Sequence, residues 1–225
     1  MSIEIIDNLI SPLYLEILQT AVFDPNFVWH YYDATAGGDN SDFSWIEDEN
    51  TEESDFFTHK ISKDANNEIV SFEPLIYALS NHLGYHIHIS RIKTNLMLPT
   101  FKKNANSYNR PHIDHPAEQA KTLLFYINDA DGDTFFFDKK FTSKDPGKLE
   151  ILERITPKAG QAVLFDSNRY HASSIPTQNR RAVINVIFWP RNLEEKKNPF
   201  PPLPPDFKNP KQIQEFFNKA YNSQE

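Results

Sequence analysis

The chain has 225 residues, 39% of them hydrophobic, and a formal net charge of −8 from 23 basic and 31 acidic side chains. That apolar content is enough for a core, while the absence of cysteine excludes disulfides, cysteine zinc ligands and a thiol nucleophile. The start lacks a basic and apolar leader, and no segment reaches the roughly 18 apolar residues of a membrane span, so we expect a soluble, cytoplasmic protein with no membrane partner.

Two helices are predicted in the first third of the chain. Ser11 and Pro12 are typical of a helix start, and apolar residues at helical spacing predict a helix over 12–22. A second helix is predicted over 71–83, because Gly84 is a typical stop signal. These helices should support a core formed by the residues that follow.

The segment between the two predicted helices contains a short strand and a charged loop. Residues 28–32, VWHYY, alternate like a strand. The stretch 39–55 holds eight Asp and Glu residues and no Lys or Arg, so it accounts for the whole net charge. Its polar content after Gly37 and Gly38 predicts a loop.

From His86 onward the pattern changes to short runs with β character, separated by turn signals that contain Gly and Pro. Strands that follow helices, and do not alternate with them, predict an α+β protein with a mainly β sandwich or barrel and helices packed outside. The predicted strands are residues 86–98, 122–128, 134–138, 149–155, 161–166 and 181–189.

The last part of the chain differs again. Residues 198–207 hold five prolines and predict an extended strap, which a short amphipathic helix over 211–221 follows. We therefore expect one domain over 1–225. It would comprise helical support and the acidic loop in 1–85, the β core in 86–190, and the strap and last helix in 191–225.

The sharpest local motif is His112-Ile113-Asp114. On an extended segment the side chains of His112 and Asp114 point to the same side, so they can converge on one ion. His171 follows the strand over 161–166 and offers a third ligand. Two histidines and one carboxylate are the ligand set of non-haem Fe(II) oxygenases. Taken alone, the motif is also typical of a surface turn in which the two side chains pair with each other.

Arg181 lies ten residues after His171, at the start of a strand rich in Val and Ile. A guanidinium that points into a barrel is costly unless it is paired. Its planar fork suits a carboxylate, so Arg181 predicts a carboxylate ligand beside the metal site.

This constellation resembles the 2-oxoglutarate and Fe(II)-dependent dioxygenases, specifically the prolyl-hydroxylase-like branch, over about residues 87–189. The strand 122–128, TLLFYIN, is similar to a strand of that branch that ends in Tyr-Leu-Asn. The segment 131–137, DGDTFFF, is similar to its Gly-Gly-Thr-Phe turn, with Asp133 in place of the second Gly. Residues 155–166, ITPKAGQAVLFD, resemble the strand that leads to the distal His.

The resemblance implies a double-stranded β-helix of the jelly-roll or cupin-like type, with Fe(II) as cofactor, 2-oxoglutarate as cosubstrate, O₂ as oxidant and ascorbate as a supporting reductant. His112, Asp114 and His171 would bind the iron. Arg181 would hold the distal carboxylate of 2-oxoglutarate.

The resemblance also implies roles for Tyr126, Asn185 and Asn95 as cosubstrate contacts: Tyr126 at the distal carboxylate, Asn185 at the chelating end, and Asn95 on a nearby strand. The expected activity couples oxidative decarboxylation of 2-oxoglutarate, to succinate and CO₂, with hydroxylation of a C–H bond in a prolyl or other protein side chain. The alternatives are a small-molecule hydroxylase and a non-catalytic jelly-roll binding protein.

Other readings of the sequence concern partners and loops. His86 and His88 could begin a cupin metal site, but no carboxylate follows at the expected place. Nucleic acid is not the expected substrate, because Ile187 stands where alkylation-repair dioxygenases carry a second Arg. The loop 99–110 is the expected lid. The acidic stretch 39–55 is either a lid or recognition surface for a basic substrate, or a solvated loop.

Overall fold

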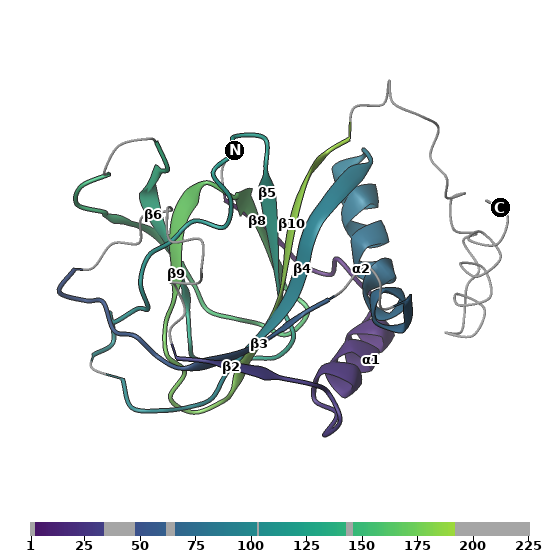
Figure 1. Cartoon of the computed structure of the whole chain (residues 1–225), viewed down its shortest axis with the longest axis horizontal. Helices are drawn as coiled ribbons and strands as arrows, with labels where there is room; N and C mark the ends of the chain where they lie inside the picture. The colour runs from purple at the N-terminus through teal and green to yellow at the C-terminus, as the bar shows by residue number, and fades with distance from the viewer. Residues whose placement is uncertain (1–2, 34–47, 62–65, 103, 143–145, 192–225) are drawn as a thin grey trace, which may run out of the picture.

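The computed structural model describes residues 3–33, 48–61, 66–102, 104–142 and 146–191 (Figure 1). These residues form two helices, α1 (Pro12–Val22) and α2 (Asn66–Leu83). The strands are β1 (Glu4–Ile6), β2 (His30–Tyr32), β3 (Phe56–Lys60), β4 (Ile87–Met97), β5 (Lys121–Tyr126), β6 (Thr134–Lys140), β7 (Ile151–Ile155), β8 (Ala162–Asp166), β9 (Arg169–Ser173) and β10 (Arg181–Pro190).

Local sequence signals correctly predicted the start of α1 and the end of α2. Ser11 caps α1, because its hydroxyl accepts a hydrogen bond from the backbone N–H of Tyr14 at 3.2 Å. Gly84 adopts a φ of 72° and ends α2 as predicted. The predicted start of α2 was wrong: the helix begins at residue 66, so Pro74 lies in its interior and removes one of its hydrogen bonds.

The strands form two antiparallel sheets. The larger sheet has the order β1-β8-β5-β10-β4-β3-β2, and the smaller has the order β7-β6-β9. All six strands predicted after residue 86 are present, whereas β1, β3 and β9 were not predicted. The mainly β architecture with flanking helices confirms the predicted fold class.

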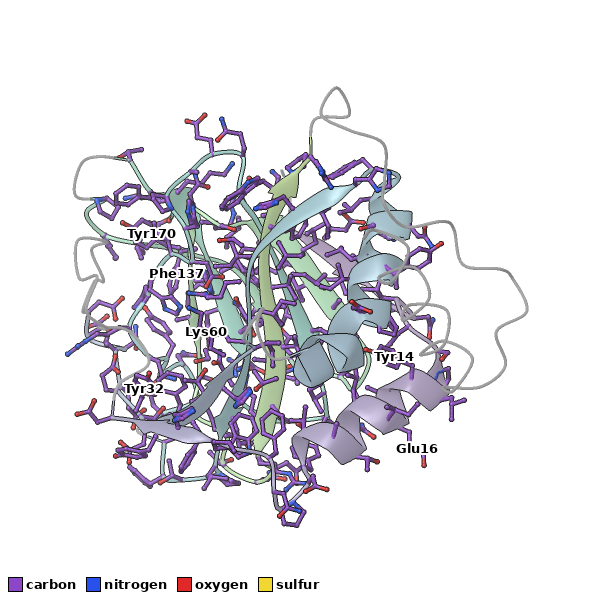
Figure 2. The ribbon with its side chains drawn as sticks, turned by 45° about the vertical axis from the view of Figure 1, so that its right-hand side comes forward. Tyr14, Glu16, Tyr32, Lys60, Phe137 and Tyr170 are labelled. Carbon is purple, nitrogen blue, oxygen red and sulfur yellow. The ribbon has the colours of Figure 1, made fainter. Side chains whose placement is uncertain are left out.

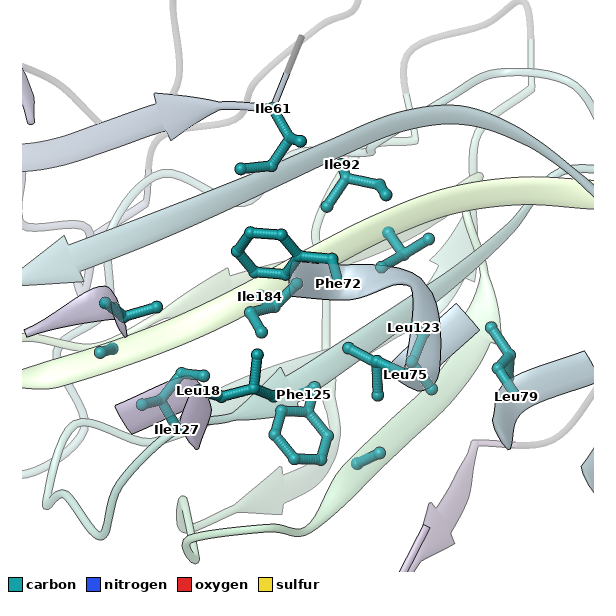
Figure 3. Packing of buried hydrophobic residues seen from close by; sticks show 14 of the residues in the cluster. Leu18, Ile61, Phe72, Leu75, Leu79, Ile92, Leu123, Phe125, Ile127 and Ile184 are labelled. Carbon is teal, nitrogen blue, oxygen red and sulfur yellow. The ribbon is translucent and has the colours of Figure 1, made fainter. Parts of the chain in front are cut away.

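The two helices cover one face of the larger sheet (Figure 1). Alternation along each strand sends every second side chain toward them, such as Ile184 on β10 and Phe125 on β5. These side chains pack against Leu18 of α1 and against Leu75 and Leu79 of α2 (Figure 3). Burial of this cluster fixes the register of the central strands.

The smaller sheet packs against the opposite face of the larger one. Val183 of β10 and Leu124 of β5 meet Phe136 of β6 between the sheets. In Figure 2, Phe137 and Tyr170 of the smaller sheet lie on the side of the molecule opposite to α1. The larger sheet is therefore the middle layer, and its side chains that face the smaller sheet alternate with those that face the helices.

Some predictions fall outside the described residues. They are the proline-rich strap and last helix in 192–225 and the first part of the acidic stretch, 39–47. The prediction of one domain over the whole chain stays a prediction. Among the helices that the structure describes, none is long and apolar enough to cross a bilayer.

Candidate active site

The structure brings the three predicted metal ligands together. His171 lies on β9, and His112 forms an isolated antiparallel bridge with it through two backbone hydrogen bonds of 2.9 Å. The backbone N–H of Asp114 donates to the carbonyl of Ser167 at 2.9 Å, just before β9. One potential ligand atom from each of His112, Asp114 and His171 lies within 4.8 Å of the others.

Hydrogen bonds orient both imidazoles for metal binding. Nδ1 of His112 lies 3.1 Å from the carbonyl oxygen of Arg110, and Nδ1 of His171 lies 3.0 Å from that of Arg169. A neutral imidazole that donates from Nδ1 keeps Nε2 as a lone-pair ligand. Burial, reinforced by the neighbouring His171, lowers the pKa of His112 to about 4, so this ligand is neutral at physiological pH.

Asp114 is held in place by three donors. Arg91 donates to its Oδ1 at 3.2 Å, while Thr122 and Asn185 donate to its Oδ2 at 2.9 and 3.1 Å. A carboxylate has about four acceptor sites, so one remains for a metal ion. Burial alone would raise the pKa of Asp114, but the adjacent His171 and Arg91 hold it below its usual range. The donor set therefore fits a 2-His-1-carboxylate site for Fe(II).

Arg181 begins β10 and lies deep beside this triad, with 4% of its surface exposed. Its Nε donates to the carbonyl of Gly132 and its Nη2 to the hydroxyl of Thr134, both at 2.8 Å. Burial lowers the pKa of its guanidinium, and no carboxylate of a described residue forms an ion pair with it. A buried cation with donors to spare is suited to an anionic ligand.

Comparison with known proteins agrees with this geometry. Residues 98–189 match the family model of the 2OG-Fe(II) oxygenase superfamily. This match covers about two fifths of the chain. Iron and 2-oxoglutarate, after which this family is named, are the cofactor and cosubstrate that the sequence predicted, and His112, Asp114 and His171 form a possible metal site. No curated protein matches the sequence.

Solved structures show that the fold of this chain is shared by enzymes with different reactions. It resembles the epimerase SnoN from nogalamycin biosynthesis at 13% identity, with 91% of each chain covered and a TM-score of 0.56. A Trichoplax adhaerens prolyl hydroxylase, solved with a peptide fragment, has 14% identity and a TM-score of 0.54, and the match covers 84% of this chain and 83% of that chain. A Burkholderia pseudomallei oxidoreductase of the family has 11% identity, 84% and 86% coverage and a TM-score of 0.55. The shared fold confirms the predicted double-stranded β-helix.

The chain has a pocket between its two sheets that joins the triad to Arg181. Asn185 and Asn95 both line it, as expected of cosubstrate contacts, although the contacts themselves stay predictions. Oδ1 of Asn95 accepts a hydrogen bond from Thr58 at 2.8 Å. The other lining residues are Phe56, Lys93, Met97, His112, Asp114, Leu124, Thr134, His171, Ser173, Arg181 and Val183.

Tyr126 does not line this pocket. Its side chain is fully buried, and its hydroxyl donates to Oγ1 of Thr134 at 2.8 Å. Burial raises the pKa of Tyr126 to about 12, so the hydroxyl stays protonated. Thr134, which lines the pocket, lies between the Tyr126 hydroxyl and Arg181, and the contact of Tyr126 with the cosubstrate stays a prediction. The sequence offered only the place of Thr134 after Asp133 as a signal.

Two cationic residues on β4 were also missed. Lys93 lines the pocket, with its ammonium 6.0 Å from the ring centre of Phe56, and Arg91 holds Asp114. Burial, reinforced by the neighbouring Arg91, lowers the pKa of Lys93 to about 8. A signal existed, because alternation from Asn95 assigns residues 93 and 91 to the same face of the strand.

The loop 99–110 is only partly available as a lid. Ser107, Tyr108 and Asn109 are buried, and the side chain of Asn109 donates to the carbonyl of Ser173 at 3.1 Å. Part of the acidic stretch holds this half of the loop: Asp48 accepts a 2.5 Å hydrogen bond from the Tyr108 hydroxyl. The second half of the loop is thus part of the packed structure.

Proposed function

We propose that the chain is a hydroxylase that couples oxidative decarboxylation of 2-oxoglutarate, to succinate and CO₂, with hydroxylation of a substrate C–H bond. The observation that carries this proposal is the convergence of His112, Asp114 and His171 next to the buried guanidinium of Arg181, which forms no ion pair with a carboxylate of the described residues. A metal site alone would fit many chemistries. The neighbouring cation adds the means to hold a dicarboxylate against the metal.

The protein residues would bind and orient the reactants. His112 and His171 would ligate iron through Nε2 and Asp114 through its carboxylate. When bound, iron supplies the redox chemistry that activates O₂ against the cosubstrate. Arg91, Thr122 and Asn185 would act as positioning residues, because their hydrogen bonds fix the Asp114 carboxylate in one orientation.

Thr134 and Arg181 would bind the distal carboxylate of 2-oxoglutarate together. The Thr134 hydroxyl already accepts from Arg181 and from Tyr126, so both of its lone pairs are used. Its own proton remains for an acceptor in the pocket that Thr134 lines. Tyr126 would then act through Thr134 as a positioning residue.

The sequence resemblance to the prolyl-hydroxylase-like branch favours a prolyl or other protein side chain as the hydroxylated group. The related folds act in different reactions, and they include an epimerase and a prolyl hydroxylase that was solved with a peptide fragment. A comparison of succinate formation with proline-containing peptides and with small molecules would separate a protein hydroxylase from a small-molecule hydroxylase.

The decisive experiment is an anaerobic titration of the Fe(II)-loaded protein with 2-oxoglutarate, followed by measurement of succinate after O₂ is admitted. We expect a cosubstrate-dependent absorption band and slow succinate formation without primary substrate. Both should disappear in His171→Ala and persist in the matched control His82→Ala, whose exposed ring pairs with Glu4 far from the pocket. Binding of 2-oxoglutarate without any succinate would instead indicate the non-catalytic jelly-roll alternative.

A further inference from the structure

Three cationic side chains besides Arg181 occupy neighbouring positions of the sheet face that carries the pocket. Lys93 and Arg91 are two residues apart on β4, so they share this face. Lys60 on β3 is the direct antiparallel partner of Lys93. Like charges directly opposite each other destabilise a sheet, so this arrangement costs stability unless an anion binds between them.

Two donors of this cluster, on Lys93 and Arg91, have no hydrogen-bond partner among the residues that the structure describes. The Lys93 ammonium makes no hydrogen bond or ion pair with any described residue, and it lies over the ring of Phe56 in a cation–π contact. Nη2 of Arg91 reaches Asp114 and Asn185, but its Nε is buried without a hydrogen-bond partner in the described structure. Buried polar groups are normally paired, which points to a missing acceptor.

The cations also exceed what the proposed reaction needs, and this step rests on the proposed function. The net charge of the reaction groups is zero, because a divalent metal and the Arg181 guanidinium balance the Asp114 carboxylate and a dianionic cosubstrate. The charges of Arg91 and Lys93 then remain as a positive excess in the pocket region. In a poorly solvated site such charges favour a further anion.

We propose that Lys93, flanked by Arg91 and Lys60, forms a second anion subsite that binds a carboxylate or phosphate group of the primary substrate. The subsite is separate from the distal-carboxylate site, because Arg181 is paired in register with Met97, whereas Lys93 is paired with Asn185 at the other end of the pocket-facing positions of β10. Exposure rises from Arg181 at 4% through the Arg91 side chain at 30% to the exposed Lys60. The cations thus lead from the surface toward the metal site.

This inference changes the expected substrate charge. A recognition surface for a basic substrate was one predicted role of the acidic stretch, but in its described part Glu53 pairs with Arg110 at 3.4 Å and Asp48 accepts a hydrogen bond from Tyr108. These carboxylates hold the loop before His112, whereas the pocket itself presents cations.

The test uses the anaerobic complex of the protein with Fe(II) and 2-oxoglutarate, titrated with acetate and with inorganic phosphate by calorimetry. We expect saturable binding of at least one anion to the wild type, weakened about ten-fold or more in Lys93→Met and retained within about three-fold in Lys93→Arg. Acetate and phosphate distinguish a carboxylate site from a phosphate site. Lys158→Met is the matched control, since Lys158 is exposed and its turn packs against α1.

Two further readouts separate a ligand role from a structural one. Lys93→Met should melt at or above the wild-type temperature without anion, because it removes an unpaired charge, and phosphate or acetate should then stabilise only the wild type and Lys93→Arg. Its affinity for 2-oxoglutarate, read from the absorption band, should be unchanged.

The proposal would be overturned if neither anion binds the wild-type complex, if Lys93→Met binds them equally well, or if this variant loses affinity for 2-oxoglutarate. In the last case Lys93 belongs to the cosubstrate site. If the wild type shows no band with 2-oxoglutarate, the proposed function fails separately. The same anion titration of the apoprotein then decides whether the anion subsite exists.

Discussion

Replacement of Thr134 by valine tests the link between the fold and the cosubstrate site. The substitution keeps the shape of the side chain but removes the acceptor shared by Arg181 and Tyr126. Both donors are buried, with 4% and 0% exposure, so neither can turn to water. Each orphaned donor costs about 1–3 kcal/mol, so loss of the acceptor for both donors in Thr134→Val should lower the free energy of unfolding by roughly 2–6 kcal/mol.

The companion variant makes the expectation specific. Tyr126→Phe alone should cost only about 1 kcal/mol, because Thr134 keeps its bond to Arg181. In the Thr134→Val background the same change removes an orphaned hydroxyl. The double variant should therefore be no less stable than Thr134→Val, and the two effects should fail to add by at least about 1 kcal/mol.

Urea denaturation of the four proteins measures these energies, and anaerobic titration of the Fe(II) protein measures affinity for 2-oxoglutarate. Thr134→Val should weaken that affinity about ten-fold or more, since it loses a donor to the carboxylate and one anchor of Arg181. Thr134→Ser, which keeps the hydroxyl, is the control and should stay close to wild type. Strict additivity of Thr134→Val and Tyr126→Phe, or an unchanged cosubstrate affinity, would refute the shared-acceptor reasoning.

Three further outcomes follow from the same site. Gly132→Ala should weaken 2-oxoglutarate binding in the anaerobic titration, because an added Cβ would lie 2.7 Å from the Ser174 carbonyl oxygen and 3.1 Å from Cδ of Arg181; wild-type affinity would contradict this. The apoprotein should lose up to ~3 kcal/mol of stability as pH falls from 6.5 to about 4, since in that range His112 binds a proton only in the unfolded state. Urea denaturation at several pH values should show that the free energy of unfolding of His112→Asn changes less with pH than that of the wild type. An equal change in both proteins would contradict this reasoning. Redox-inactive Zn²⁺ at about 100 times its dissociation constant should stabilise the apoprotein by ~2.7 kcal/mol in thermal melts, and stabilisation of Asp114→Ala to the same extent would count against the triad.

The metal triad was predictable because its geometry is encoded locally. The spacing of His112 and Asp114 requires only an extended backbone, and the structure supplies one through the bridge to residue 171. Arg181 was predictable from a conflict in the sequence, a charge at the start of an apolar strand. Both signals concern residues whose cost or orientation can be judged without knowing which strands are neighbours.

The supporting residues were not predictable in the same way, because their roles depend on strand pairing. Thr134 accepts hydrogen bonds from Arg181 and Tyr126 because β6 of the smaller sheet packs against β10 and β5. β9 was missed because four of its five residues are buried, so it lacks the alternation of a half-exposed strand, and because it begins with a charged residue, Arg169. That charge is accommodated by a 2.9 Å hydrogen bond from Nη1 to the carbonyl of Phe137, which no sequence pattern announces.

The distribution of charge shows most clearly what the structure adds to the sequence. The net charge of −8 equals the charge of one acidic stretch, for which a lid or recognition surface for a basic substrate and a solvated loop were the two predicted alternatives. In the structure, Asp48 and Glu53 of that stretch are bound to Tyr108 and Arg110 of the loop before the metal ligands. Of the cations in and beside the pocket, Lys93 and Arg91 come from β4, whose sequence shows only the alternation of an ordinary strand. Overall acidity therefore describes the stretch that holds the loop, while the pocket itself selects for anions.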